Sequence, residues 1–205
     1  MIAIVDYGSG NVKAFANIYR RLGVPFLVAE KALDLRGATK VILPGVGAFD
    51  HVMRRLAASG MREALDEVVL ARRLPILGVC VGMQVLANSS EEGDLPGLGW
   101  VDGAVKRFDV ATLTHATYLP HMGWNDVRPM RESGLFRDLS IDYRFYFLHS
   151  YYFQCSRTED VIAVTDYGGP FSSAVNNGNI FGVQFHPEKS HEWGIQLLQN
   201  FANLC

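Results

Sequence analysis

Residues 75–84 read Pro-Ile-Leu-Gly-Val-Cys-Val-Gly-Met-Gln, and this stretch decides the fold around it. The apolar run before Cys80 is typical of a fully buried strand, and the residues after it favour a helix. Cys80 lies between Gly78 and Gly82, the Gly-x-nucleophile-x-Gly pattern of a nucleophile elbow, in which glycines avoid a collision across the tight turn. A thiol there would lie over a helix N-terminus, whose partial positive charge favours the thiolate. Taken alone, the stretch also fits a buried structural cysteine in a glycine-rich turn.

The residues before this stretch follow the order strand, helix, strand, which is typical of a parallel α/β sheet. The apolar residues of 12–22 recur on one helical face, and Gly23 and Pro25 end that helix. We expect strands over residues 2–6, 26–29 and 40–43, and helices over residues 12–22 and, with a break near Ser59-Gly60, over 50–73. After the elbow we expect a short helix to about Asn88 and then a loop over residues 89–93.

From Trp100 onward the pattern changes to short alternating strands separated by turns. Asn176-Asn177-Gly178-Asn179 is a strong hairpin signal, because asparagine and glycine accept the positive φ of a tight turn. Strands are expected over residues 101–108, 117–127, 144–154, 161–165, 173–175 and 180–185, with a closing helix over 192–204. This half predicts antiparallel strands added to the parallel sheet. Because no linker-like stretch divides the chain, we expect one domain over residues 1–205.

The composition argues against several classes of function. A formal net charge of −2 gives no electrostatic case for nucleic acid or a membrane surface as a partner. The three cysteines, Cys80, Cys155 and Cys205, show no paired spacing, which favours a reducing compartment over a disulfide framework. The sequence has no signal-peptide pattern and no bilayer-length apolar run, and its histidines lack metal-ligand spacing. We therefore expect a soluble, cytoplasmic protein with no metal and no cofactor.

A candidate catalytic base lies in His186-Pro187-Glu188, directly after the last apolar strand. A thiol nucleophile needs a base that takes its proton and returns it to a leaving amine, and histidine suits both steps. A carboxylate beside the imidazole fixes its tautomer and stabilises its charged form. Because strand ends of one parallel sheet lie side by side, we expect Cys80 and His186 to meet. This pairing favours the interpretation of Cys80 as a nucleophile.

Together the motifs carry a family resemblance. Residues 78–84 and 182–188 resemble the catalytic motifs of the class I (triad-type) glutamine amidotransferases. Residues 120–125 (Pro-His-Met-Gly-Trp-Asn) and 146–152 (Tyr-Phe-Leu-His-Ser-Tyr-Tyr) narrow the resemblance to the glutaminase subunits of imidazole glycerol phosphate synthases, which supply ammonia in histidine biosynthesis. The resemblance covers essentially the whole chain. It implies a three-layer α/β/α, flavodoxin-like fold with a central, mostly parallel sheet.

The resemblance also implies a role for each matched residue. Cys80 would attack the side-chain amide of L-glutamine, giving a γ-glutamyl thioester and ammonia, and water would then release glutamate. His186 would be the general base and acid, with Glu188 as its orienting partner. The implied substrate-binding residues are Gln84, Glu92, Ser150 and Tyr151. His149 is interpreted as a hydrogen-bonded structural histidine.

The loop Pro44-Gly45-Val46-Gly47 follows a predicted strand at the edge where α/β sheets bind ligands, and its glycines let backbone N–H groups face that edge. The resemblance implies an oxyanion hole formed by the N–H groups of Val81 and of Val46 or Gly47. In the family, glutaminase activity depends on the partner and its ligand. We hypothesise that docking reorients the 44–47 backbone and completes the oxyanion hole.

The partner that the resemblance implies is a (β/α)₈-barrel cyclase subunit. A chain of this size has no second active site, so another chain must use the ammonia, and in the family it passes through the barrel of the partner in a heterodimer. The positions matching the docking surface are Asn11, Lys13, Pro120, His121, Met122, Gly123, Trp124, Asn125, Tyr146 and Lys189. Trp124 is an amphipathic anchor of the kind enriched at the core of interfaces.

Three alternatives stay open. Residues 97–101 and 190–196 are closer to paralogous copies, which supply ammonia to amidotransferases that modify cell-surface sugar acids. A Cys-His-Glu site on an α/β sheet also suits a stand-alone peptidase or γ-glutamyl hydrolase, which would not need the motif at 120–125. A pseudoenzyme that only docks is the third, and labelling of Cys80 by a glutamine-mimicking electrophile would exclude it.

Overall fold

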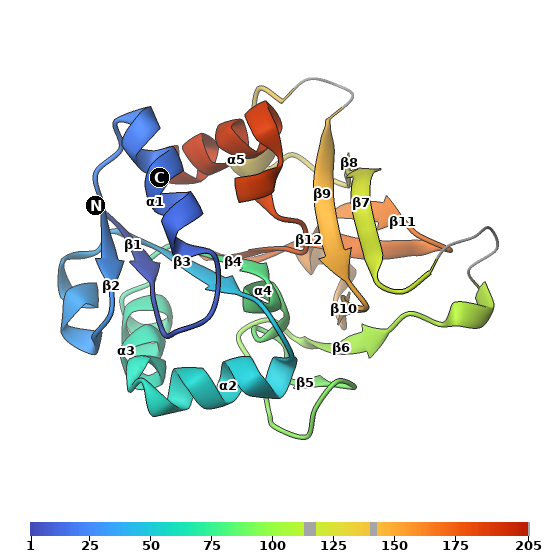
Figure 1. Ribbon diagram of the computed structural model, residues 1–205, viewed down its shortest axis with the longest axis horizontal. Coiled ribbons are helices and arrows are strands. Elements are labelled where there is room, and N and C mark those ends of the chain that lie inside the picture. Colours follow the sequence, from blue (N-terminus) through green and yellow to red (C-terminus); the bar gives the residue numbers. More distant parts are fainter. Residues whose placement is uncertain (113–117, 140–142, 205) are drawn as a thin grey trace.

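The computed structural model describes residues 1–112, 118–139 and 143–204. A central sheet lies between two layers of helices, with α1 and α5 on one side and α2 and α3 on the other (Figure 1). The helices are α1 (Val12–Leu22), α2 (Phe49–Ala58), α3 (Met61–Asp66), α4 (Val81–Gln84) and α5 (His191–Asn203). This is the three-layer arrangement that the sequence predicts. Thr117, the predicted start of a strand, and Cys205 lie outside the described residues.

The parallel half of the sheet is built mostly from the apolar segments of the first 80 residues. Its strands are β1 (Ile2–Val5), β2 (Phe26–Ala29), β3 (Lys40–Gly45), β4 (Ile76–Cys80) and β13 (Ile180–Val183), in the order β2-β1-β3-β4-β13. All neighbouring pairs among these strands are parallel. β1 and β4 are buried at every residue, as expected of strands that helices cover on both faces. The carboxyl ends of β3, β4 and β13 therefore lie side by side.

Antiparallel strands extend the sheet beyond β13, as the sequence predicts. They are β12 (Pro170–Asn177), β10 (Tyr151–Cys155), β6 (Gly103–Arg107), β11 (Val161–Asp166) and β8 (Arg128–Pro129), with β5 (Ser89–Ser90) parallel to β6 at the edge. Pairing of Asn177 with Ile180 confirms the predicted hairpin. The loop prediction for residues 89–93 is wrong in part, because Ser89 and Ser90 pair with β6.

A separate sheet of two antiparallel strands consists of β7 (His121–Asp126) and β9 (Arg144–His149), which lie side by side in Figure 1. Successive side chains of these strands alternate between two faces. Met122, Trp124 and Leu148 are exposed, whereas His121 and His149 are buried. The two-stranded sheet therefore has an outer face at the surface of the chain and an inner face within the core.

The prediction of one strand over 144–154 is wrong, because the chain changes sheets at Ser150. On β9, Phe145 and Phe147 pack against Phe185, with ring centroids 4.0 and 5.7 Å apart. β10 pairs instead with β6 and β12 of the large sheet. Ser150 is the corner between two strands that belong to different hydrogen-bond ladders, and alternation of apolar residues alone does not reveal such a corner.

The helix after the elbow is shorter than predicted, ending at Gln84 and not near Asn88. The carbonyl groups of residues 85–87 accept hydrogen bonds from the backbone of residues 98–101 and not from a further helical turn. The predicted break near Gly60 is confirmed, since Gly60 separates α2 from α3 with a backbone φ of 67°.

The tight turn at Cys80 depends on close approach of the backbone. Cys80 has a positive φ of 56°, which is uncommon for a residue with a side chain. A Cβ atom on Gly82 would collide with the carbonyl oxygen of Leu43 in β3, and one on Gly78 would lie 2.5 Å from the carbonyl oxygen of Gly82. The two glycines therefore let α4 begin directly against β3.

Gly82→Ala is expected to lower the free energy of unfolding by about 1–3 kcal/mol, because its methyl group meets backbone atoms that cannot rotate away. Gly37→Ala is the matched control, since a Cβ atom there meets nothing within 4 Å. Urea unfolding of both variants measures the difference. Equal stability of the two variants would contradict this account of the turn.

Candidate active site

The three residues of the predicted triad lie together. Cys80 ends β4, and His186 follows the adjacent parallel strand β13, so that both residues line the same pocket and interact electrostatically. The Nδ1 atom of His186 lies 2.9 Å from Oε1 of Glu188, and the two side chains are only 4% and 2% exposed. Pro187 begins a short 3-10 turn, which brings Glu188 back to the imidazole ring.

The two partners of His186 set its charge. Burial by itself would lower the pKa of His186, but hydrogen bonds and charges from Cys80 and Glu188 raise it from 6.5 to about 10. An imidazole with this pKa is protonated at neutral pH, so a thiolate at Cys80 would face an imidazolium. The helix N-terminus that the sequence predicts beside the thiol belongs to α4, which has only four residues. The imidazolium therefore places a positive charge at the thiol whatever the contribution of this short helix.

A pocket of about 190 Å³ opens beside Cys80. Its lining residues are Val46, Gly47, Cys80, Val81, Gln84, Glu92, Leu148, His149, Ser150, Tyr151, His186 and Lys189. Every residue that the sequence predicts for the oxyanion hole or for substrate binding is among them. The pocket thus gathers residues that follow β3, β4 and β13, Glu92 from the loop after β5, and the corner at Ser150.

Gln84 forms part of the pocket floor and is 2% exposed. Its Nε2 group donates to the carbonyl oxygen of Tyr151 and to Oε1 of Gln184, both at 3.0 Å. Nε2 of Gln184 lies 3.9 Å from the sulfur of Cys80. Gln184 is not among the site residues predicted from the sequence, although a glutamine within the apolar run 180–185 is a signal for it.

Glu92 is the acidic side chain among the residues that line the pocket. Its Oε2 atom accepts a hydrogen bond of 2.9 Å from the backbone N–H of Phe49, the first residue of α2. Burial raises the pKa of this carboxyl group, the Phe49 N–H opposes that change, and the neighbouring Asp50 adds to it. A cationic group entering the pocket would stabilise the carboxylate in its charged form.

The backbone of Val46 is held by a side chain that the sequence analysis did not assign. The hydroxyl group of Ser9 accepts a hydrogen bond of 3.2 Å from the N–H of Val46 and donates one of 2.9 Å to its carbonyl oxygen. The Val46 N–H is therefore directed at Ser9 and away from the pocket. The hydroxyl contacts a residue 37 positions away, and no local sequence pattern signals such a contact.

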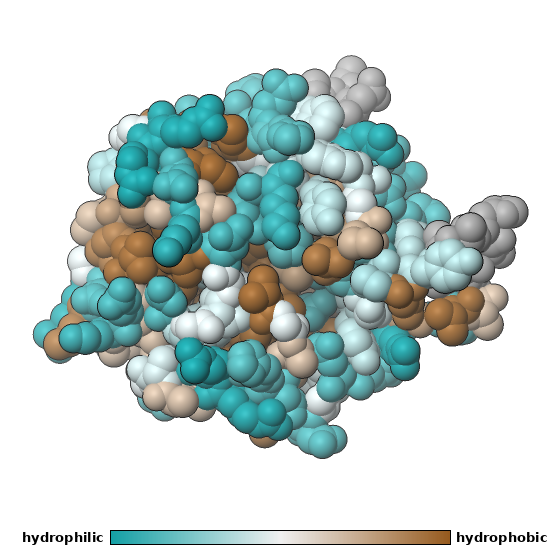
Figure 2. All heavy atoms as spheres, viewed as in Figure 1, coloured by the Kyte–Doolittle hydropathy of each residue, from teal (hydrophilic) through white to brown (hydrophobic). Residues whose placement is uncertain are grey.

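Most predicted docking residues lie at the surface. Asn11, Lys13, Pro120, Met122, Trp124 and Lys189 are exposed, and Gly123, Asn125 and Tyr146 are half-buried. His121 differs from the others, because it is 3% exposed and lies on the inner face of β7. On this side of the molecule, hydrophobic patches lie where β3 and β9 end, among hydrophilic side chains (Figure 2).

Aromatic contacts order the outer face around Trp124. Its ring lies edge-on to Tyr146 at 6.2 Å and stacks on His191 at 5.1 Å, while Trp193 lies edge-on at 6.2 Å. The ammonium group of Lys189 lies 5.5 Å above the Tyr146 ring. Trp124 is thus held in place before any partner binds.

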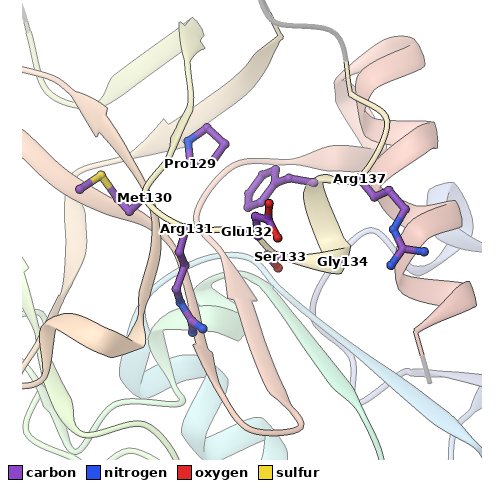
Figure 3. A pocket seen from close by; sticks show the side chains of 8 residues that line it. Pro129, Met130, Arg131, Glu132, Ser133, Gly134 and Arg137 are labelled. Atoms are coloured by element: carbon purple, nitrogen blue, oxygen red, sulfur yellow. The ribbon is translucent and has the colours of Figure 1, made fainter.

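A larger pocket of about 600 Å³ lies elsewhere, between residues 129 and 137 (Figure 3). Its two arginines, Arg131 and Arg137, point away from each other, so its charges do not converge. Among the described residues, no group of three or more His, Cys, Asp or Glu side chains could hold a metal ion. Within the same part of the chain, no helix is long and apolar enough to cross a membrane.

Cys80 is expected to react with iodoacetamide faster than Cys155 at neutral pH. His186 places a positive charge beside Cys80, whereas burial raises the pKa of Cys155 to about 12. His186→Asn removes the charge and is expected to slow alkylation of Cys80 about tenfold or more, while Cys155 serves as the internal control. Mass spectrometry of the cysteine peptides measures each rate. A faster reaction at Cys155, or no effect of His186→Asn on Cys80, would overturn this view of the thiol.

Comparison with known proteins agrees with the geometry of the site. The model of the class I glutamine amidotransferase family matches residues 3–204. Over 204 residues and the full length of both chains, the sequence is 58% identical to the imidazole glycerol phosphate synthase subunit HisH of Bdellovibrio bacteriovorus and 52% identical to that of Leptospira interrogans.

Solved structures share the fold at low sequence identity. A crystal structure of a glutamine amidotransferase superposes with a TM-score of 0.75 at 19% identity and covers 100% of both chains. The structure of PurLQS from Thermotoga maritima gives 0.69 at 20% identity, covering 98% of this chain and 97% of that one. On the family match and the full-length relatives, this chain belongs to the class I glutamine amidotransferases.

Proposed function

We propose that this chain is the glutaminase subunit of an imidazole glycerol phosphate synthase, which hydrolyses L-glutamine to L-glutamate and ammonia for histidine biosynthesis. The observation that carries the chemistry is the buried contact of Cys80, His186 and Glu188 at adjacent strand ends. The full-length likeness to HisH subunits supports the choice of this subfamily.

The reaction follows from the charges at the triad. The sulfur of Cys80 attacks the carboxamide carbon of glutamine, and His186 donates a proton to the leaving nitrogen as the C–N bond breaks. Ammonia leaves and a γ-glutamyl thioester remains. His186 then takes a proton from water, which attacks the thioester and releases glutamate and the thiol. Glu188 holds the ring through Nδ1 and stabilises its charged form.

The pocket lining supports the predicted substrate contacts. Glu92 carries the negative charge that a substrate α-ammonium group needs. Ser150 and Tyr151 line the pocket at the corner between the two sheets, where their backbone is the proposed contact to the substrate, and Gln84 holds that corner through Tyr151. The oxyanion would be bound by the N–H of Val81 and by a second N–H from Val46 or Gly47.

The outer face of the two-stranded sheet is the proposed docking surface for a cyclase subunit. Val46 and Leu148 line the pocket and are 45% and 36% exposed, so the surface continues into the mouth of the site. Met122 and Trp124 extend it with further exposed apolar area, which is unusual in a free chain and is typical of an interface. A barrel docked here would receive ammonia without its release to solvent.

The contact between Ser9 and Val46 supports dependence on the partner. While the Val46 N–H donates to Ser9, it is not available to a tetrahedral intermediate. We propose that docking near Asn11 and Lys13, in and just after the same loop, releases Val46 and completes the oxyanion hole. A stand-alone peptidase or γ-glutamyl hydrolase would have no use for such a contact.

A glutaminase subunit for the modification of a cell-surface sugar acid remains the second candidate. The segment 190–196, which resembles those paralogues, reaches the docking surface, because His191 and Trp193 both contact Trp124. Residues that contact Trp124, the proposed anchor of the interface, contribute to the specificity of the chain for one partner over another.

We further propose one domain over residues 1–205, which the family match over 3–204 supports. A cytoplasmic location is proposed because Cys80 and Cys155 are free thiols, as is common in reducing compartments.

Mixing the chain with a histidine-pathway cyclase and its substrate is expected to raise glutaminase activity about tenfold or more, whereas a sugar-acid amidotransferase subunit is expected to have no effect. Glutamate release measures the rate, and Cys80→Ser is the inactive control. Stimulation by the second partner alone would overturn the proposed acceptor. Equal activity with and without either partner would instead indicate a stand-alone hydrolase.

Ser9→Ala is expected to raise the glutaminase rate of the isolated chain about fivefold or more, because the Val46 N–H loses its acceptor. The rate of the complex should change little, since docking already releases Val46. Ser89→Ala, an exposed serine on the edge strand β5, is the matched control. An unchanged or lower basal rate in Ser9→Ala would remove Ser9 from the mechanism.

A further inference from the structure

The inner face of the two-stranded sheet carries two histidines that the triad does not use. His121 on β7 and His149 on β9 are opposite each other in the strand register. They are 3% and 6% exposed, whereas Met122 and Trp124 of the same strand β7 lie on the outer face. A polar pair is thus buried directly beneath the proposed docking surface. Buried polar groups of this kind require hydrogen-bond partners.

A continuous series of hydrogen bonds runs through the pair. Nδ1 of His149 lies 2.8 Å from the carbonyl oxygen of Tyr151, and Nε2 of His149 lies 3.0 Å from Nδ1 of His121. Nε2 of His121 lies 3.2 Å from Nδ2 of Asn125, whose own Oδ1 accepts from the backbone N–H of Asp126. The series therefore connects the docking strand with the corner of the pocket.

The partners fix the direction of every bond. A carbonyl oxygen can only accept, so His149 donates from Nδ1 to Tyr151, and its Nε2 atom is the acceptor in the neutral ring. His121 must then donate from Nδ1 to His149, and its Nε2 atom accepts from the amide group of Asn125. Both rings are neutral Nδ1–H tautomers in this arrangement.

Packing keeps the two rings neutral and in place. His121 is stacked between Phe147 at 4.7 Å and Tyr167 at 3.9 Å, with interplanar angles of 20° and 23°. Burial lowers the pKa of His121 to about 4, and burial together with the neighbouring His121 lowers that of His149 to about 3. Neither ring is charged at neutral pH, so the tautomers do not exchange through an imidazolium.

The series ends at the floor of the active site. The carbonyl oxygen of Tyr151, which accepts from His149, also accepts from Nε2 of Gln84 at 3.0 Å. Gln84 contacts Gln184, whose Nε2 group lies 3.9 Å from the sulfur of Cys80. Two sets of residues therefore hold the Ser150 corner in place. One is the histidine pair on the inner face of the two-stranded sheet, and the other is the pair of glutamines beside the thiol.

We propose that His121 and His149 are positioning residues, forming a relay of two Nδ1–H imidazoles that fixes the substrate-binding corner at Ser150 and Tyr151 to the docking strand β7. This proposal rests on the proposed function in two respects: that the corner binds glutamine, and that a cyclase subunit docks on β7. A partner that shifts β7 from its outer face moves the corner with it, because His121 lies on the same strand as Trp124. The relay thus gives docking a second route to the site, separate from the loop at Val46.

The first test is the tautomeric state of the rings in the full chain. Long-range proton–nitrogen NMR spectra at neutral pH are expected to show protonated Nδ1 and unprotonated Nε2 for both His121 and His149. An Nε2–H tautomer or a charged ring at either position would overturn the relay. This measurement needs neither glutamine nor a partner, so its failure is distinct from failure of the proposed function.

The second test is the substrate dependence of the complex with the cyclase. His121→Phe keeps an aromatic ring between Phe147 and Tyr167 but removes the donor to His149. It is expected to raise KM for glutamine about tenfold with a smaller change in kcat, because a buried acceptor is left unpaired and the corner loosens. Tyr167→Phe, which keeps its stacking on His121 and loses only a hydroxyl bonded to Tyr118, is the control.

The two tests decide between a relay and simple packing. Equal KM values for His121→Phe and Tyr167→Phe would show that the ring of His121 only fills space, and would overturn the relay. If His121→Phe fails to fold, the NMR spectra of the unmodified chain still decide. If the complex of the unmodified chain with the cyclase does not turn over glutamine, that result would count against the proposed function and not against the assignment of the tautomers.

Discussion

The position of the thiol depends on one constraint, the close approach of α4 to β3 directly after β4 ends. A side chain on Gly82 would collide with the carbonyl oxygen of Leu43, so this glycine permits the approach, while Cys80 has a positive φ of 56° at the turn and lines the pocket. The strand order β3-β4-β13 then supplies the other groups, because the loop at Val46 and the residue His186 follow the two strands that flank β4. The chemistry of the site is therefore a consequence of parallel strand ends that share one edge.

The sequence was sufficient for the parts of this arrangement that rest on local patterns. The buried strands, the amphipathic helix α1 and the hairpin at Asn177 follow from periodicity and turn residues, and the structure agrees with them. The elbow and the motif at His186 were recognisable because their chemistry needs certain residue types at fixed spacings. The corner at Ser150 could not be recognised in this way. Apolar residues alternate in both strands that meet there, and the strands differ only in which distant strand each one pairs with.

The side chains that contact the catalytic and oxyanion residues from distant parts of the chain could not be predicted from the sequence either. Ser9 reaches Val46 across 37 residues, and Gln184 reaches Gln84 across 100. A local pattern can mark an unusual polar residue, such as the glutamine within the apolar run 180–185, but it does not identify the distant partner of that residue. The burial of His121 could not be predicted from its motif either. The motif at residues 120–125 predicts a docking surface, whereas the alternation of side chains along β7 places His121 on the inner face. What a residue does here depends on which face its strand presents.

The account rests on Cys80 as the nucleophile toward glutamine. The most direct measurement is mass spectrometry of the complex with the cyclase, quenched with acid during glutamine turnover and then digested. The account predicts one γ-glutamyl group on the peptide that contains Cys80, and none in Cys80→Ser. Turnover of glutamine without that adduct, or with the adduct on another residue, would contradict it.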